Sequence, residues 1–275
     1  MKTKLKTRVF WYGVFILFGI LMIYPIIFAI SNSFKTLQDA INSILDLIPS
    51  APTIANYLFL FTRLDIWQIT GNTFFVATVV TVFKLATSLL AAYALVFFDF
   101  RFKNLVYFIL ISTIFIPFTV TMIPNFLTIS RMDLIDNPLG VILPQLADAL
   151  GIFLMRQSMR MIPKPLVEYA RMENLGHLRI LKDIVMPLIK PAIISTGIIF
   201  FINSWNEFVW PMLILRAQEN FTLPLALQMF ISAEGGSDFT YAMALSVISM
   251  IVPLLLFFIF QKHIISTFVS SGIKG

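Results

Sequence analysis

Residues 161–191 read MIPKPLVEYARMENLGHLRILKDIVMPLIKP, and this polar stretch separates two strongly apolar parts of the chain. A single charge at the centre of a bilayer costs ~2.5–3.5 kcal/mol on insertion scales. The charged side chains in or beside the stretch are Arg160, Lys164, Glu168, Arg171, Glu173, Arg179, Lys182, Asp183 and Lys190. We therefore expect the whole stretch to stand outside the hydrocarbon, on the membrane face chosen by the neighbouring spans.

The pattern within this stretch predicts two short helices. Pro163 and Pro165 suit a helix start, because proline is tolerated in the first turn and fixes φ there. Asn174 and Gly176 tolerate positive φ, so we expect the first helix to end at them. A second helix is expected over 178–185. A short amphipathic helix outside the membrane either docks into a groove on another protein or lies on the lipid surface as an ordinary loop.

The spacing of six residues in this stretch matches a known motif: Glu168, Tyr169, Ala170, Asn174, Ile184 and Pro187. It resembles the cytoplasmic motif of permease subunits of ATP-driven importers, in which Glu-Ala-Ala is followed by three residues, Gly, nine residues and Ile-x-Leu-Pro. The chain departs from the motif at Tyr169 for Ala, Asn174 for Gly and Met186 for Leu. Of these, Tyr169 matters most, because a large ring at a helix–groove contact requires a wider pocket.

The resemblance extends from about residue 72 to the C-terminus, and it points to the ABC importer permeases of the maltose, glycerol-3-phosphate and multiple-sugar type. It implies coupling helices at about 163–185 that contact a cytoplasmic ATPase subunit. The residues to which it assigns this contact are Glu168, Tyr169, Ala170, Glu173, Asn174, Gly176, Ile184 and Pro187.

Composition indicates an integral membrane protein independently of that motif. Of 275 residues, 59% are hydrophobic and 12% are charged, and 29 are Phe. A soluble domain of this size carries roughly 25% charged residues. The predicted fold class is therefore all-α, with six transmembrane helices. The expected spans are 9–34, 72–98, 105–129, 138–155, 188–215 and 239–260, with bends expected at Pro117 and Pro124 in the third.

The distribution of basic residues orients these spans. Segments 1–8, 99–104, 156–190 and 261–275 hold 15 of the 20 Lys and Arg residues. The positive-inside rule then puts both termini and the 161–191 stretch in the cytoplasm. The resemblance implies that the membrane is a bacterial inner membrane. We divide the chain into an N-terminal helix with an external segment (1–71), an importer-type transmembrane domain (72–262) and a cytoplasmic tail (263–275). The predicted outer loop 216–238 is implied by the resemblance to reach toward a binding protein.

Several chemistries lack the residues they need. The sequence contains no GxxxxGK[ST] phosphate loop, so ATP and magnesium belong to another chain. It has no cysteine, and its two histidines, His177 and His263, are far apart. We predict no catalytic residue, no metal site and no bound cofactor. The net charge of +6 follows from topology and does not indicate nucleic acid.

Ionisable and polar residues within the spans are candidates for a translocation pathway. Lys84 either pairs with Asp148 or Glu207 to fix helix packing or acts as a cation lining the path. In the segment NSWNEFVW, a continuous helix would put Asn203, Asn206 and Trp210 on one face, with Glu207 beside them. These residues either bind solute hydroxyls and rings or form an interface belt with inter-helix hydrogen bonds. The candidate set is Lys84, Asp148, Asn203, Trp205, Asn206, Glu207 and Trp210.

We therefore predict a non-catalytic permease subunit that moves a carbohydrate or related polyol across the membrane by alternating access. The resemblance implies a second homologous permease, two ABC ATPase subunits and an external solute-binding protein as partners, in addition to the solute and membrane lipid. An ion-coupled secondary transporter and a membrane-embedded enzyme are the alternatives, and neither explains the Glu168–Pro187 motif.

Overall fold

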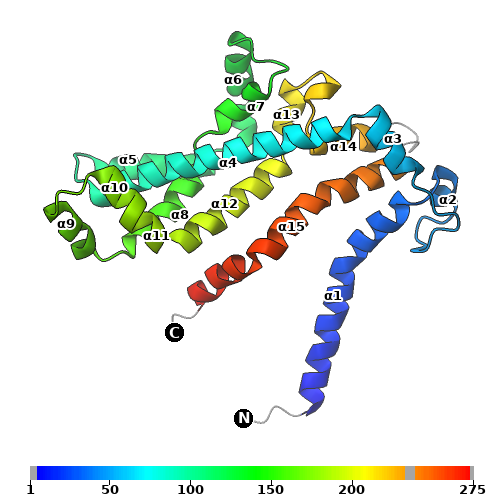
Figure 1. The fold of residues 1–275 in the computed structure, drawn as a ribbon, viewed down its shortest axis with the longest axis horizontal. Helices are drawn as coiled ribbons and strands as arrows, with labels where there is room; N and C mark the ends of the chain where they lie inside the picture. Colours follow the sequence, from blue (N-terminus) through cyan, green and yellow to red (C-terminus); the bar gives the residue numbers. More distant parts are fainter. Residues whose placement is uncertain (1–4, 233–238, 273–275) are drawn as a thin grey trace. The chain divides into compact units, whose positions relative to one another are not determined.

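The computed structural model describes residues 5–232 and 239–272, and every regular element in those ranges is a helix (Figure 1). This confirms the predicted all-α class. Among the described residues, three helices are long and apolar enough to cross a membrane alone, namely Thr7–Ser33, Ile66–Phe97 and Phe239–Gln261. Three further pairs of helices meet the same test as bent pairs. Six spans result if each bent pair is one span, in agreement with the predicted number.

The described residues divide into two compact units. The first comprises Met1–Gln68 and Leu225–Val252, and it contains α1 (Leu5–Ser33), α2 (Leu37–Asn42), α3 (Ala55–Arg63) and parts of α14 (Leu223–Ser232) and α15 (Phe239–Gly272). Its core joins α3 to α15, because the rings of Phe59 and Tyr241 stack with centroids 4.2 Å apart. Beside them, Thr240 Oγ1 and Asn56 Oδ1 lie 3.1 Å apart in a buried hydrogen bond.

The loop after α1 is tied down by a buried lysine. Lys35 is fully buried, and its Nζ donates to the carbonyl oxygens of Ser43 and Asp46, each at 2.6 Å. Asn56 Nδ2 donates to the carbonyls of Ser33 and Lys35, both at 2.8 Å. A buried ammonium is stable only when its donors are satisfied. Lys35 therefore serves to order the backbone around it.

The second unit comprises Ile69–Pro224 and Pro253–Gly275. In it α4 (Ile66–Phe97), α8 (Ala149–Arg160) and α12 (Lys190–Trp205) lie alongside one another (Figure 1). Gly151 of α8 permits this approach, because a Cβ there would overlap Ser88 Oγ of α4 and lie 2.6 Å from the ring of Phe200 of α12. Small residues at such crossings let membrane helices pack closely.

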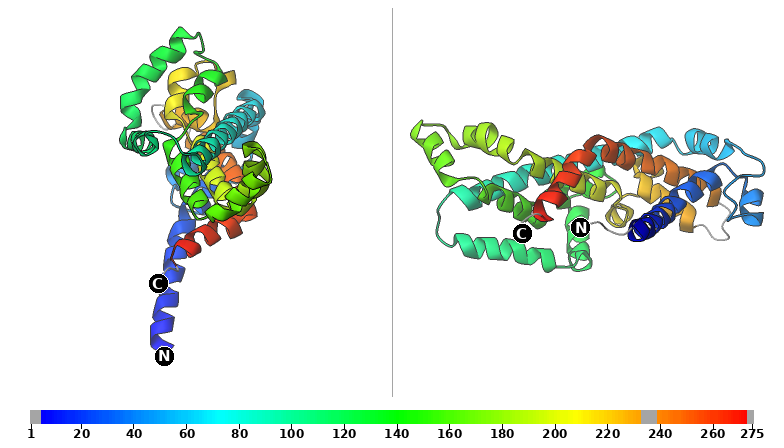
Figure 2. Two further views of the ribbon diagram at one scale, coloured as in Figure 1. Left: turned by 90° about the vertical axis from the view of Figure 1, so that its left-hand side faces the viewer. Right: turned by 90° about the horizontal axis from the view of Figure 1, so that it is seen from below.

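Three bent pairs of helices make up much of this unit. Each pair includes one short segment of another helical type: η1 (Thr113–Phe115), η2 (Leu143–Gln145) or the π-helical η3 (Leu181–Val185). In the first, α5 (Lys103–Ser112) and α6 (Phe118–Arg131) meet at 98° (Figure 2). In the second, α7 (Pro138–Ile142) precedes α8 with a bend of 45°. In the third, α10 (His177–Ile180) and α11 (Met186–Leu188) precede α12 with a bend of 85°. The other short helices are α9 (Lys164–Met172), α13 (Val209–Ile214) and η4 (Gln218–Asn220).

Prolines explain only part of this bending. Pro117 stands at the start of α6, where the predicted bend is confirmed. Pro124 lies inside α6 without breaking the helix. A single missing N–H donor is tolerated where the neighbouring helical hydrogen bonds remain.

The fifth predicted span, 188–215, is not one helix. α12 ends at Trp205 and α13 begins at Val209, so the interruption falls among the residues from which a continuous face was predicted. The last predicted span, 239–260, agrees with the apolar span Phe239–Gln261, and α15 continues beyond that span to Gly272. Of the predicted outer loop 216–238, residues 233–238 lie outside the described residues.

Candidate functional site

The helix α9 ends at Met172, and Asn174 follows its C-cap Glu173, close to where the sequence predicts the end. Asn174 has φ of 57°, the left-handed conformation that Asn adopts more readily than most residues. The amide of Leu175 donates to the carbonyl of Ala170 at 3.1 Å, and that of Asn174 donates to Arg171 at 2.9 Å. These two bonds form a Schellman motif, which satisfies carbonyls that the helix end would otherwise leave without donors. Pro163 and Pro165 occupy the start of α9, also as predicted.

The inner face of α9 is fixed to the rest of the second unit. Val167 and Ala170 are buried, and they belong to one hydrophobic cluster with Tyr93 of α4 and with Met155 and Met159 of α8. Fully burying a side chain the size of Val or Met stabilises by roughly 1.5–3 kcal/mol. The helix α9 is therefore anchored to the ends of two spans.

Polar contacts add to this anchoring. Arg171 Nη2 donates to the carbonyl of Phe97 at 2.5 Å, which links α9 to the end of α4. His177 Nδ1 lies 3.1 Å from the hydroxyl of Tyr93, and its ring lies 4.3 Å from that of Phe98. The sequence did not indicate His177 or Tyr93 as linking residues, because 84 positions separate them and no local pattern pairs them.

The outer face of α9 is apolar and exposed. Leu166, Tyr169 and Met172 recur every third residue, and their exposed fractions are 43%, 69% and 76%. Glu168 is also exposed, and it forms no hydrogen bond or ion pair with any residue that the structure describes. It is the fifth residue of α9, beyond the first turn in which the helix dipole favours a carboxylate. A role limited to dipole stabilisation does not account for Glu168.

The residues expected to couple to an ATPase therefore divide into two groups. Ala170 is buried and Ile184 is half-buried against the same hydrophobic cluster, so these two position the segment. The exposed members, which present a surface outward, are Glu168, Tyr169, Glu173, Asn174, Gly176 and Pro187. Leu178, 75% exposed, extends this apolar surface onto α10, although the sequence motif does not include it.

Lys84 and Asp148 form an ion pair inside the second unit. Lys84 Nζ lies 3.4 Å from Asp148 Oδ2, and the two side chains are 15% and 25% exposed. Asp148 also caps α8, since its Oδ1 accepts from the amide of Gly151 at 3.0 Å. The Lys84 ammonium further lies 5.4 Å from the ring centroid of Phe200. Of the two partners considered for Lys84, the structure selects Asp148.

A cavity of about 320 Å³ opens beside this pair. Glu207 lines it and caps α13, with Oε1 accepting from the amides of Val209 at 3.0 Å and Trp210 at 3.2 Å. Trp210 is 2% exposed, and its Nε1 donates to the carbonyl of Gly140 at 3.3 Å. The other lining residues include the phenyl, hydroxyl and amide groups of Phe118, Thr121, Asn125 and Gln145. The groups around this cavity can donate and accept hydrogen bonds and can stack on a ring.

Four of the predicted pathway residues do not line this cavity: Asp148, Asn203, Trp205 and Asn206. The exposed Asn203 and Asn206 flank Trp205, which is fully buried with its ring stacked on Phe201 at 5.7 Å. The single face predicted for Asn203, Asn206 and Trp210 is wrong, because the helix ends before Trp210. The sequence analysis did not identify three other polar residues of the cavity lining, Thr121, Asn125 and Gln145, which lie in other spans. Their polarity within apolar helices was the only feature of the sequence that could have indicated them.

Among the side chains that the structure describes, those of residues 7–231 and 239–261, no group of three or more His, Asp or Glu is placed to hold a metal ion. The chain resembles known proteins along most of its length. It is 31% identical over 264 residues to the arabinooligosaccharides transport system permease protein AraQ of Bacillus subtilis, covering 95% of this chain and 94% of that protein. It is 33% identical over 201 residues to the sn-glycerol-3-phosphate transport system permease protein UgpE of Pectobacterium atrosepticum, covering 73% and 72%.

A solved structure has the same fold. The crystal structure of a bacterial ABC transporter involved in the import of the acidic polysaccharide alginate contains a chain that matches with a TM-score of 0.80 and 28% identity, covering 95% of this chain and 99% of that one. The model of the family described as "Binding-protein-dependent transport system inner membrane component" matches residues 84–268. This match spans α9, the Lys84–Asp148 pair and the cavity beside it. The chain therefore belongs to the family of binding-protein-dependent transport system inner membrane components.

Proposed function

We propose that this chain is the permease subunit of an ATP-driven importer and that it moves a carbohydrate or related polyol across the cytoplasmic membrane by alternating access. The observation that carries the proposal is the two-faced helix α9. One face is packed against the ends of α4 and α8, and the other presents exposed Leu166, Tyr169 and Met172 with the unpaired Glu168. An exposed apolar surface on an anchored helix fits a groove on a partner protein.

In this proposal the ATPase lies on the side of α9. The excess of Lys and Arg in segments 1–8, 99–104, 156–190 and 261–275 supports a cytoplasmic position for α9 and for both termini. Closure of two ATPase subunits pushes on α9, and the packed cluster passes the displacement to α4 and α8. ATP then acts as a ligand with different affinities for two states of the transporter. A second homologous permease and an external solute-binding protein complete the assembly.

The substrate class rests on the relatives and on the cavity. Relatives named for arabinooligosaccharides, glycerol-3-phosphate and alginate all concern carbohydrates or polyols. The cavity beside Lys84 offers Glu207, amides and a hydroxyl together with the Phe118 and Trp210 rings. Amides and carboxylates bind hydroxyl groups, and aromatic faces stack on sugar rings. Because Asp148 already neutralises Lys84, the cavity suits a neutral solute better than an anionic one.

The test is uptake by the complete transporter in proteoliposomes, with its ATPase subunits inside and its binding protein outside. A panel of oligosaccharides, sugar alcohols and glycerol phosphate identifies the solute. We expect uptake that requires ATP and that a proton gradient alone does not support. Uptake driven by a proton or sodium gradient without ATP would instead establish the ion-coupled transporter.

A further inference from the structure

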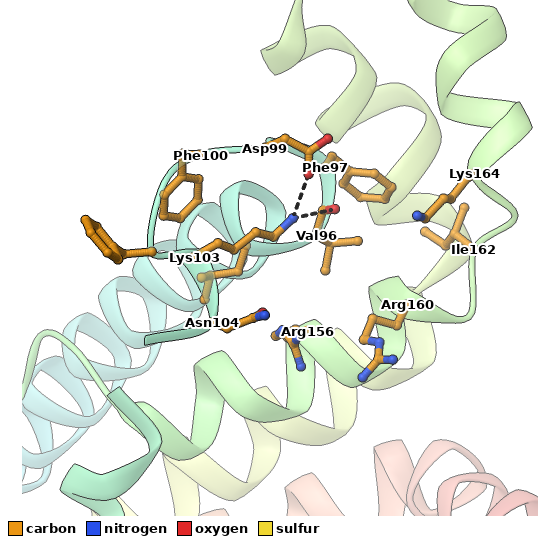
Figure 3. A pocket seen from close by; sticks show the side chains of 12 residues that line it. Val96, Phe97, Asp99, Phe100, Lys103, Asn104, Arg156, Arg160, Ile162 and Lys164 are labelled. Carbon is orange, nitrogen blue, oxygen red and sulfur yellow. Dashed lines mark hydrogen bonds and ion pairs between the residues drawn. The ribbon is translucent and has the colours of Figure 1, made fainter. Parts of the chain in front are cut away.

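A second, larger pocket lies where α4 ends, α5 begins and α8 ends, apart from the Lys84 cavity (Figure 3). Its volume is about 640 Å³. The charged side chains lining it are four cations and one carboxylate: Lys103, Arg156, Arg160, Lys164 and Asp99. The carboxylate is itself fully exposed, so it neutralises little of the positive charge inside.

Only one of the four cations is satisfied by the protein. Lys103 Nζ donates to the carbonyl of Phe98 at 2.7 Å and lies 3.5 Å from Asp99 Oδ1. Arg156, Arg160 and Lys164 have no carboxylate or carbonyl partner in the described part of the chain. The pocket therefore contains three cationic groups whose hydrogen-bond donors are available.

Arg156 is held in place without being neutralised. Its guanidinium lies 3.7 Å from the ring centroid of Tyr107 on α5, and its Nε is buried with no hydrogen-bond partner among the described residues. A buried donor without an acceptor is costly unless a ligand supplies one. A guanidinium stacked on a ring keeps the planar edge that binds phosphate oxygens in a bidentate manner.

The start of α5 adds a backbone donor to the same pocket. Phe102 occupies the N-cap position with φ of 65°, and no side chain caps this helix. The next residues, Lys103 and Asn104, both line the pocket. The Lys103 amide donates to the carbonyl of Phe100 at 3.3 Å, so the Asn104 amide is the backbone donor that this helix start offers to the pocket. An amide at the start of a helix, together with the helix dipole, favours an anion.

The surroundings distinguish a lipid from a soluble anion. Beyond the pocket, α5 exposes Leu105, Phe108 and Ile109 along the first half of a bent span. Phe100 and Phe102, at the pocket itself, are also exposed. A ligand with a phosphate at one end and hydrocarbon chains at the other can bind both the cationic pocket and the apolar surface of α5. A free phosphate can bind only the pocket.

We propose that this pocket binds the phosphate of an anionic phospholipid headgroup, with Arg156, Arg160 and Lys164 as its ligands and the acyl chains lying along α5. The assignment to the cytoplasmic leaflet rests on the orientation in the proposed function, but lipid binding itself does not. Because Lys164 begins α9, a bound headgroup also stabilises the junction between α8 and the proposed coupling helix.

The test uses the full-length chain, purified with its partner subunits in a neutral detergent. Bound phosphatidylglycerol and phosphatidylethanolamine are counted by native mass spectrometry for the parent protein, for Arg160→Gln/Lys164→Gln and for Arg179→Gln/Lys182→Gln. Both double variants remove two exposed positive charges from the same stretch, and only the first pair lines the pocket. We expect phosphatidylglycerol affinity to fall roughly 10- to 30-fold in the pocket variant and less than about twofold in the control.

Each alternative result is decisive. Equal losses in the two double variants would show diffuse surface attraction and overturn the pocket. Retention of phosphatidylglycerol by the pocket variant would overturn it as well. If inorganic phosphate alone displaces the lipid from the parent protein, the site belongs to a soluble anion.

Arg156→Lys supplies a further check, because it keeps the charge but loses the planar guanidinium. We expect it to bind phosphatidylglycerol more weakly than the parent protein, and unchanged affinity would contradict bidentate recognition. A Glu168→Ala variant without transport should still bind the lipid, so failure of the proposed function and failure of this site are distinguishable.

Discussion

Charged side chains behave differently in two regions of this chain. Inside the spans, Lys84 lies 3.4 Å from Asp148, and Glu207 accepts two backbone amides. Around the start of α9, Glu168 and Arg160 have no partner within the described residues. Charge in a low-dielectric interior must be compensated within the protein, whereas water keeps the cost of an exposed charge small. The difference separates groups that hold the fold from groups left available to other molecules.

Glu168→Ala tests the charged groups that are left available to other molecules, and it should have the largest effect. Without its carboxylate, we expect docking of the ATPase to weaken by about 30-fold or more, because truncating one partner of a desolvated charge pair costs roughly 2–5 kcal/mol. Transport and binding-protein-stimulated ATP hydrolysis, measured in proteoliposomes, should fall accordingly. The thermal stability of the isolated chain should not change, since Glu168 is exposed and forms no hydrogen bond or ion pair with the described residues.

Asn174→Gly is the control for that experiment. It keeps the left-handed conformation and brings the chain closer to the importer motif, so we expect near-normal transport. Normal transport by Glu168→Ala would remove the distinction drawn between the two regions.

Asp148→Ala tests the charged groups that hold the fold. It leaves the Lys84 ammonium without its partner and removes the cap of α8, so we expect the free energy of unfolding to fall by about 2–4 kcal/mol. Thermal unfolding in detergent measures this. Asp183→Asn is the matched control, because its ion pair with Arg179 is exposed and contributes at most about 0.5 kcal/mol.

The double variant Lys84→Met/Asp148→Asn sharpens the result. If the pair serves packing, the double variant is more stable than Asp148→Ala, and solute preference does not change. Stable single variants with altered solute preference would instead make Lys84 a pathway residue.

Gly151→Ala should have a somewhat smaller effect through the close packing that seats the ion pair. The added methyl group overlaps Ser88 of α4 and the ring of Phe200, so we expect a loss of about 1–3 kcal/mol in unfolding free energy. Gly71→Ala in α4 is the control, since nothing lies within 4 Å of the added atom. Equal stability of both variants would contradict the helix crossing at Gly151.

Asp136 gives the smallest predicted effect. Among the described residues, its charge is neither paired with a cation, like that of Asp148, nor left without a partner, like that of Glu168, but accepts hydrogen bonds. The amides of Arg216 and Ala217 and the side chain of Asn220 donate to its carboxylate, and these bonds lower its pKa. Because the pKa is lower in the folded state, the carboxylate stabilises the fold at any pH above its ordinary pKa near 3.9. This stabilisation is lost as the pH falls through the folded pKa. We expect amide exchange at Arg216, corrected for its intrinsic rate, to become less protected below about pH 4, and Asp136→Asn to remove that dependence.

The sequence predicted the elements that depend on local chemistry. The end of α9 followed from the tolerance of Asn174 for positive φ, and the bend before α6 followed from Pro117. The number of spans followed from apolar length. These features require only neighbouring residues, so a single sequence contains them.

What the sequence did not predict depends on contacts between distant residues or on competing caps. The helix breaks after Trp205, where Glu207 caps a new helix. The prediction of one continuous helix through this segment assumed that no side chain would form hydrogen bonds in competition with the backbone. Pro211, in the first turn of α13, was the available sign of a helix start. The choice of Asp148 over Glu207 as the partner of Lys84 required the packing of α4 against α8, which no local pattern encodes.

The π-helical turn Leu181–Val185 determines where bending is easiest between α9 and α12. Pro187 and Pro191 follow it, and neither can donate a backbone hydrogen bond, so this joint has fewer bonds resisting curvature than the helices beside it. On the other side, α9 is packed directly onto α4 and α8. A displacement of α9 is thus transmitted directly to α4 and α8, and along the chain it reaches α12 through a compliant joint. We expect α12 to move with α4 and α8, on which it packs at Gly151, and the joint to bend so that α9 and α12 need not turn as one rigid piece.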